Sequence, residues 1–141
     1  MIDPKKLQDI VYSLDGDVLD LPFWEGCERG EFLLHRCGKC GRSYWPAACC
    51  TEHGADAMEW VAASGRGTVH VHTVMRRGRC AATGENAPYA VAVVELEEGP
   101  FFHSNIAGVP FDEVRSGLEV EAEFVTHANG MKVPIFRPVR S

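Results

Sequence analysis

Two short motifs in the first half of the sequence have the residue types and spacing of metal ligands. Cys37 and Cys40 are separated by two residues, and Cys50 and His53 repeat that spacing, each pair followed directly by a glycine. Zinc takes four nitrogen or sulfur ligands in a tetrahedron, and two ligands at this spacing can reach one ion from a single tight turn. The two motifs together therefore predict a structural zinc site.

The second half of this site has more than one solution in the sequence. Cys49 directly precedes Cys50, so Cys49 with His53, or Cys49 with Cys50, would also complete four ligands. Adjacent cysteines rarely bind one ion together, which favours Cys50 and His53. A closed set of three cysteines and one histidine leaves no position for water, which disfavours catalytic zinc, and its histidine disfavours a four-thiolate iron site. We expect one zinc ion per chain, bound by Cys37, Cys40, Cys50 and His53.

A second candidate site is the arginine cluster Arg76, Arg77 and Arg79, which lies in a polar, glycine-containing loop. Guanidinium groups match the oxygen atoms of phosphates, so these arginines are candidate ligands for an anion. Cys80 follows them, and neighbouring positive charge favours the thiolate form of a cysteine. No base adjoins Cys80 in the sequence, and no nucleotide-binding or hydrolase motif is present. We therefore expect no catalytic residue in this chain.

The composition excludes several classes of protein. The 141 residues carry 14 Lys and Arg against 20 Asp and Glu, a formal net charge of −6. Nucleic-acid binding depends largely on Lys and Arg, so this balance disfavours a polyanion partner. The charged N-terminus lacks the apolar core of a secretion signal, and no apolar run is long enough to cross a membrane. A cytoplasmic protein is expected, in which clustered cysteines indicate a metal rather than disulfides.

The elements that would position these sites are mostly strands. Residues 1–30 are expected to be helical, with one helix starting after Asp3 and a second starting after Asp20. Residues 31–57 form the predicted zinc ribbon. Residues 58–141 carry five or six short strands and few helices, which is typical of a small closed barrel. The main predicted strands of this last region are residues 68–75, 89–96, 101–107, 119–127 and 133–136.

Several side chains are candidate surface features. Phe23 and Trp24 have two interpretations, either an anchor to the core or a contact for a partner protein. Trp45 and the apolar residues 133–136 are further candidate docking side chains. Glutamates alternate with apolar residues over 119–124, and we expect them on the solvent face of an edge strand, where charge discourages aggregation.

The order of motifs along the chain resembles the domain of unknown function 35 (DUF35) family. The residues that carry the resemblance are Phe23-Trp24, the stretch 30–34, the first knuckle 36–42, Trp45-Pro46, Trp60, the run 64–69, Pro88-Tyr89 with the strand after it, and residues 133–138. The second knuckle departs from the family pattern, which usually has Cys-Pro-x-Cys after two prolines. Here the segment 49–53 reads Cys-Cys-Thr-Glu-His.

The resemblance implies a fold and a function. The fold would be mainly β: N-terminal helices, a rubredoxin-like zinc ribbon and a five-stranded OB-fold barrel. The chain would be a non-catalytic, zinc-binding accessory subunit of a thiolase-family enzyme in a hetero-oligomer. It would complete or stabilise the acyl-CoA site for thiolytic cleavage, with benzoylsuccinyl-CoA of anaerobic aromatic degradation as one candidate substrate. The arginines at 76, 77 and 79 would face the phosphates of coenzyme A.

Two alternatives remain at this stage. The same module could serve a MaoC-type enoyl-CoA hydratase in place of a thiolase, which the sequence does not distinguish. An OB-fold with a zinc ribbon could also bind single-stranded nucleic acid, but such a groove combines cationic residues with stacking aromatics. The net charge of −6 disfavours this second alternative.

Overall fold

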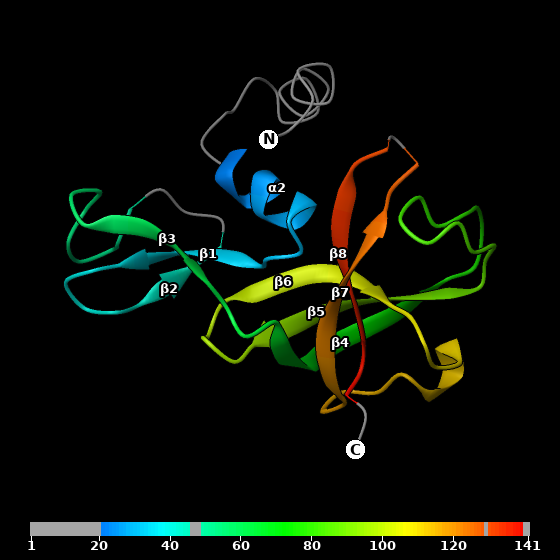
Figure 1. Cartoon of the computed structure of the whole chain (residues 1–141). Helices are drawn as coiled ribbons and strands as arrows, with labels where there is room; N and C mark the ends of the chain where they lie inside the picture. The colour runs from blue at the N-terminus through cyan, green and yellow to red at the C-terminus, as the bar shows by residue number, and fades with distance from the viewer. Residues whose placement is uncertain (1–20, 46–48, 129, 140–141) are drawn as a thin grey trace.

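The computed structural model describes residues 21–45, 49–128 and 130–139, and shows one short helix, a small sheet and a barrel (Figure 1). The helix α2 spans Leu21–Glu28 and buries Phe23 and Cys27. It confirms the second expected helix, whereas the first, expected after Asp3, lies outside the described residues. No helix in the described ranges combines the length and the apolar character needed to cross a bilayer.

A three-stranded antiparallel sheet follows α2 and carries the metal-binding motifs. Its strands are β1 (Leu33–Cys37), β2 (Ser43–Tyr44) and β3 (Met58–Ala62), with β1 in the centre. β3 pairs with β1 along its whole length and with no barrel strand. The division expected between residues 57 and 58 would assign β3 to the barrel, although β3 belongs to the sheet of the ribbon. We propose that the barrel unit begins after this strand.

The remaining strands form a closed barrel, which confirms the predicted OB-type fold. Their order around the barrel is β4-β5-β6-β8-β7, and η1 (Phe111–Glu113) is a short 3-10 helix between β6 and β7. One parallel contact, between Ile106 and Phe136, closes the barrel between β6 and β8. The strands are β4 (Arg66–Met75), β5 (Tyr89–Leu96), β6 (Phe101–Ile106), β7 (Glu119–Thr126) and β8 (Lys132–Pro138).

Closure of the barrel corrects the expectation for the glutamate-bearing strand. β7 lies between β4 and β8 and pairs with both, so it is not an edge strand. Glu119 is exposed, but Glu123 is half-buried and forms an ion pair with Arg137 on β8. The alternating pattern identified the strand correctly, because alternation reports which face is buried and not which strands lie on either side.

A β-bulge interrupts β4 between Val69 and Val71. Val69 is 2% exposed, whereas Val71 is 51% exposed. Strict alternation would place these two valines on the same face of the strand. The bulge inserts one extra residue and turns the remainder of the strand over, so strict alternation does not hold across the bulge.

A cluster of aromatic rings joins α2 and the ribbon to the barrel. The ring of Phe32 lies 5.6 Å from that of Phe23 on α2, 5.0 Å from that of Phe102 on β6 and 6.1 Å from that of Phe136 on β8. Phe23 and Phe136 are fully buried. The anchor interpretation of Phe23 is therefore confirmed, and residues 134–136 belong to the core rather than to a docking surface.

We predict that Phe23→Ala lowers the free energy of unfolding by about 3–5 kcal/mol, because it removes a fully buried ring and leaves a cavity between the barrel and the ribbon. Urea denaturation measures the change. Phe101→Ala is the matched control, since Phe101 is 47% exposed and its loss leaves no cavity. Equal effects of the two substitutions would contradict the anchoring role of Phe23.

Candidate metal centre

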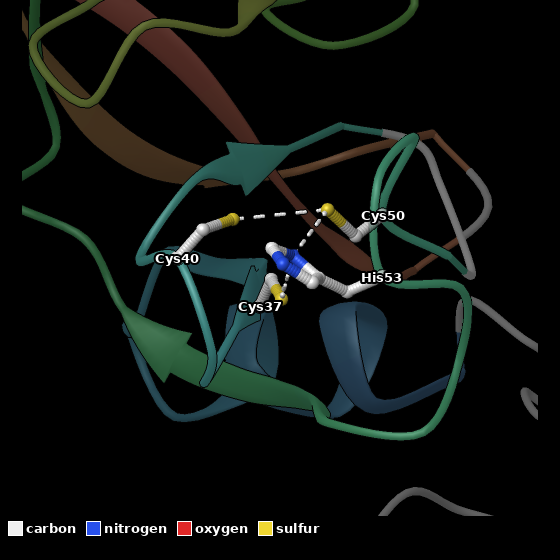
Figure 2. Close-up of side chains that lie close together, drawn as sticks. All are labelled: Cys37, Cys40, Cys50 and His53. Atoms are coloured by element: carbon white, nitrogen blue, oxygen red, sulfur yellow. Dashed lines mark hydrogen bonds between the residues drawn. The ribbon is translucent and has the colours of Figure 1, made fainter.

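Two loops of the ribbon bring the predicted metal ligands together. Cys37 ends β1 and Cys40 lies in the turn that follows, while Cys50 and His53 come from the loop before β3. Figure 2 shows these four side chains converging on one point from the two loops. Their three Sγ atoms and a histidine nitrogen all lie within 4.8 Å of one another.

The separations between these atoms fit a tetrahedral zinc ion. Zinc–sulfur bonds of about 2.3 Å and zinc–nitrogen bonds of about 2.1 Å, at tetrahedral angles, separate two sulfurs by about 3.8 Å and a sulfur from a nitrogen by about 3.6 Å. The Sγ atoms of Cys40 and Cys50 are 3.7 Å apart. Nδ1 of His53 lies 3.6 Å from Sγ of Cys37 and 3.6 Å from Sγ of Cys50. A bound zinc ion would supply a cross-link between the two loops.

The glycines after each motif have a local structural reason. Gly41 has a φ of 76° and Gly54 a φ of 66°, the left-handed conformation that favours glycine. The Gly41 amide donates to the carbonyl oxygen of Cys37 at 2.7 Å, which closes the first turn. The amides of Cys50 and Gly54 each donate to the carbonyl oxygen of the other residue. In both motifs the glycine amide therefore bonds to the carbonyl oxygen of the first ligand residue, and the resulting turns direct both pairs of ligand side chains toward one point.

Hydrogen bonds stabilise the thiolate of Cys50. The hydroxyl of Tyr44 donates to its Sγ at 3.3 Å, and the amide of Glu52 donates to it at 3.4 Å. These contacts, the Tyr44 bond first, lower the pKa of Cys50 to about 6. The Tyr44 hydroxyl is oriented in turn by the amide of Thr51, which donates to it at 3.2 Å. Sequence reasoning did not identify Tyr44, because nothing in its neighbourhood signals a contact across the ribbon.

The other cysteines lie outside the four-residue group. Cys49 is exposed, and its side chain is not a member of that group. Cys27 is fully buried in the core, and this burial raises the pKa of its thiol to about 12. Cys80 is also buried, in contrast to the surface loop expected for it. The loop around Cys80 is tied by backbone hydrogen bonds to Gly84 and Glu85.

The three predicted anion-binding arginines follow β4 and are all exposed. Arg79 pairs with Asn86 in an isolated β-bridge, and its Nε donates to the carbonyl oxygen of Gly84 at 2.8 Å. The arginines do not contact the metal-binding group. They lie on the segment between Met75 and Cys80, both of which line a hollow in the protein surface.

This hollow has a volume of about 550 Å³ and lies where α2, the 76–88 loop, β6 and the start of β8 meet. Its lining is mostly apolar and includes Trp24, Tyr89, Val91 and Phe102, with His103 among the polar residues. The indole Nε1 of Trp24 is buried and has no hydrogen-bond partner among the described residues. The sequence did not predict the hollow, because its walls come from elements that are distant along the chain.

Comparison with known proteins assigns a family to both parts of the chain. Residues 24–59 match the model of the ChsH2 rubredoxin-like zinc ribbon domain, and residues 60–125 match that of the ChsH2 C-terminal OB-fold domain. A DUF35 domain-containing scaffold protein of Methanothermobacter thermautotrophicus is 34% identical over 96 residues, which cover 63% of this chain and 68% of that protein.

Two longer relatives are named as hydratase subunits. A probable enoyl-CoA hydratase alpha subunit of Thermomonospora curvata is 30% identical over 84% of this chain. A 3-oxo-4,17-pregnadiene-20-carboxyl-CoA hydratase alpha subunit of Mycobacterium tuberculosis is 27% identical over 73% of this chain. The chain spans 37% and 32% of the lengths of these two proteins.

Two solved structures share the fold. A chain of the structure described as "Ltp2-ChsH2(DUF35) aldolase" superposes with a TM-score of 0.74 at 28% identity, and the match covers 84% of this chain and 93% of that one. A DUF35 protein of unknown function from Sulfolobus solfataricus superposes with a TM-score of 0.57 at 16% identity, covering 86% of this chain and 91% of that one. This second likeness concerns the fold alone.

We predict that the purified protein contains one zinc ion per chain and that Cys50→Ser abolishes this content, because the set of four ligands is then incomplete. Structural zinc contributes about 10–16 kcal/mol to the folding of small metal modules, so the ribbon should unfold with the loss. Metal analysis by mass spectrometry measures the content. Cys49→Ser is the matched control and should retain zinc, since Cys49 lies outside the group.

The Tyr44→Phe variant keeps all four metal ligands but removes the hydrogen bond from the Tyr44 hydroxyl to Sγ of Cys50. Removal of a hydrogen bond to a metal ligand typically weakens metal binding about 10–100-fold, so this variant should lose zinc at a lower chelator concentration than the unmodified protein. Zinc retained in Cys50→Ser but lost in Cys49→Ser would show that the ligand assignment is wrong. Well-folded protein without zinc would overturn the site.

Proposed function

This chain belongs to the DUF35 family of proteins with a ChsH2-type zinc ribbon and OB-fold, and we propose that it is a non-catalytic accessory subunit of an acyl-CoA-processing enzyme. The observation that carries the proposal is the state of its cysteines. Acyl-CoA carbon–carbon chemistry of the thiolase type uses an activated cysteine with an acid–base group beside it. Among the described residues, none of the thiols has the environment of such a nucleophile.

Three of the cysteines contribute to the metal-binding group, so their sulfur atoms are not available as nucleophiles. Burial raises the pKa of Cys27 to about 12, which keeps it protonated near neutral pH. Cys80 is 3% exposed. Cys49 is exposed, and within the described ranges its thiol makes no hydrogen bond to a base. The reactive cysteine of such a reaction would therefore belong to the partner enzyme.

The hollow beside α2 supports an association with acyl-CoA. Its apolar walls suit an acyl group, and Arg76, Arg77 and Arg79 lie on the segment between two of its lining residues. Coenzyme A carries phosphates that arginine side chains recognise. We propose that the hollow and the arginines form the part of a shared acyl-CoA site that this subunit contributes.

The finer proposal is a thiolase-type partner. The similarity to a chain of the Ltp2-ChsH2(DUF35) aldolase, over 84% of this chain, supports it, because aldolases, like thiolases, make or break carbon–carbon bonds. Benzoylsuccinyl-CoA remains the candidate substrate within this class. The second candidate partner is an enoyl-CoA hydratase, and the names of the Thermomonospora and Mycobacterium relatives favour it.

We expect no thiolase, thioesterase or hydratase activity from this chain alone, and activity from a thiolase-type subunit only when the two are co-expressed. Acyl-CoA turnover by each chain and by the mixture, with the mass of the complex, tests this. Cys27→Ala and Cys80→Ala variants serve as controls. The accessory role would be overturned if the isolated chain turned over acyl-CoA and either cysteine substitution abolished that turnover. Formation of a complex with a hydratase, and not with a thiolase, would favour the second candidate partner.

Replacement of Arg76, Arg77 and Arg79 by alanine should raise the apparent KM of the complex for acyl-CoA about tenfold with little change in kcat. Charge attraction acts on encounter and binding more than on the chemical step, so added salt should have the same effect on the unmodified complex. Arg115→Ala is the matched control, as an exposed arginine elsewhere on the barrel. An unchanged KM at low ionic strength would remove the arginines from the substrate path.

A further inference from the structure

The strand β4 has different neighbours in its two halves. Arg66, Gly67 and Thr68 pair with β5 on one side and with β7 on the other. Val69 still bonds on that second side, because its amide donates to Leu118 and its carbonyl oxygen accepts from Gly117. Beyond the bulge, β4 continues beside β5 (Figure 1), but no described backbone group bonds to the other edge of residues 71–75.

Apart from the bulge at its start, this unpaired edge lacks the features that usually protect one. Natural proteins blunt exposed strand edges with lysine, proline, inward-pointing charge or a covering loop. Residues 71–75 contain three β-branched residues, Val71, Thr73 and Val74, and no proline or charged residue. Four of the five positions are exposed. The edge therefore presents a row of amide and carbonyl groups to solvent on a segment with strong preference for a sheet.

Exposed apolar side chains lie on the edge segment and on the neighbouring outer face of the barrel. The exposed large hydrophobic residues of the described chain are Val71 at 51%, Met75 at 42% and Phe101 at 47%. The first two lie on the unpaired segment itself. Phe101 lies on β6, and its ring is 5.0 Å from the ring of His70 at the bulge. A shallow groove lined in part by Val71, Thr73 and Val93 continues the apolar surface across β5.

We infer that the edge Val71–Met75 receives an extended segment of the partner polypeptide as an additional strand. An unpaired strand edge is recognised by another strand, whose backbone supplies the complementary hydrogen bonds and whose alternate side chains enter neighbouring pockets. On the exposed face, Val71 and Met75 would contact apolar side chains of that segment. The inference rests on the proposed function for the identity of the partner, an acyl-CoA-processing enzyme.

Charge distinguishes such a partner from a second copy of this chain. The stretch from Gly67 to Arg79 contains His70, His72 and three arginines but no Asp or Glu, although the whole chain has a net charge of −6. Two copies paired through this edge would place cationic groups opposite one another, with no carboxylate between them. The complementary occupant is a β-branched segment that carries a carboxylate near Arg76.

Hydrogen–deuterium exchange of the complex tests the inference. The full chain is expressed with an affinity tag in its own host, and the bound protein is identified by mass spectrometry. We expect the amides of residues 71–75 that point away from β5 to exchange rapidly in the isolated chain and at least about tenfold more slowly in the complex. Val71→Lys, which adds a charge to the edge, should reduce recovery of the partner about tenfold.

Val71→Thr is the matched variant, because threonine keeps the β-branched shape and the edge and should retain most of the binding. An acyl-CoA enzyme bound with unchanged exchange at residues 71–75 would overturn this inference and leave the proposed function intact. Protection of the edge by a protein of another class would support the inference and overturn the proposed function. Recovery of the chain alone, or protection of the edge in a homodimer, would overturn the inference.

Discussion

Packing between four phenylalanine rings is the interaction on which the rest of the structure depends. Phe23 on α2 and Phe32 before β1 meet Phe102 and Phe136, which come from two different barrel strands. Full burial of one such ring contributes about 1.5–3 kcal/mol. The cluster fixes the ribbon and α2 against the barrel, and it thereby forms the hollow that Trp24 and Phe102 both line.

The metal centre provides a second, local constraint. The ribbon contains short strands and two loops, and such a unit has too few apolar contacts to hold its loops in place. The ligand atoms of Cys37, Cys40, Cys50 and His53 lie within 4.8 Å of one another, three of their separations match a zinc tetrahedron, and Tyr44 supports the Cys50 thiolate. A metal at this point cross-links the loops and makes the ribbon a rigid body.

A rigid ribbon and a closed barrel suit a subunit that presents surfaces rather than performing chemistry. Three surface features have no role in the core or in the metal centre: the apolar hollow, the arginines beside it and the unpaired edge of β4. All three adjoin the segment from the bulge in β4 to the loop after it. This concentration on one segment supports the proposal that the acyl-CoA ligand and the enzyme partner share a single interface.

The sequence by itself determined what depends on neighbouring residues. The spacing of the metal motifs specified a four-ligand zinc site with Cys37 and Cys40 as its first pair, and the apolar run of residues 89–96 specified β5, because ligand spacing and hydrophobic runs are local patterns. Tertiary structure decided what depends on distant pairing: the exclusion of Cys49 from the metal group, the burial of Phe136, and the position of β7 inside the sheet. It also decided that β4 turns over at Val69 and that Tyr44 reaches Cys50. These outcomes depend on how strands close into a barrel and how loops meet across a sheet. Such contacts join residues that are distant in the sequence, so no local pattern predicts them.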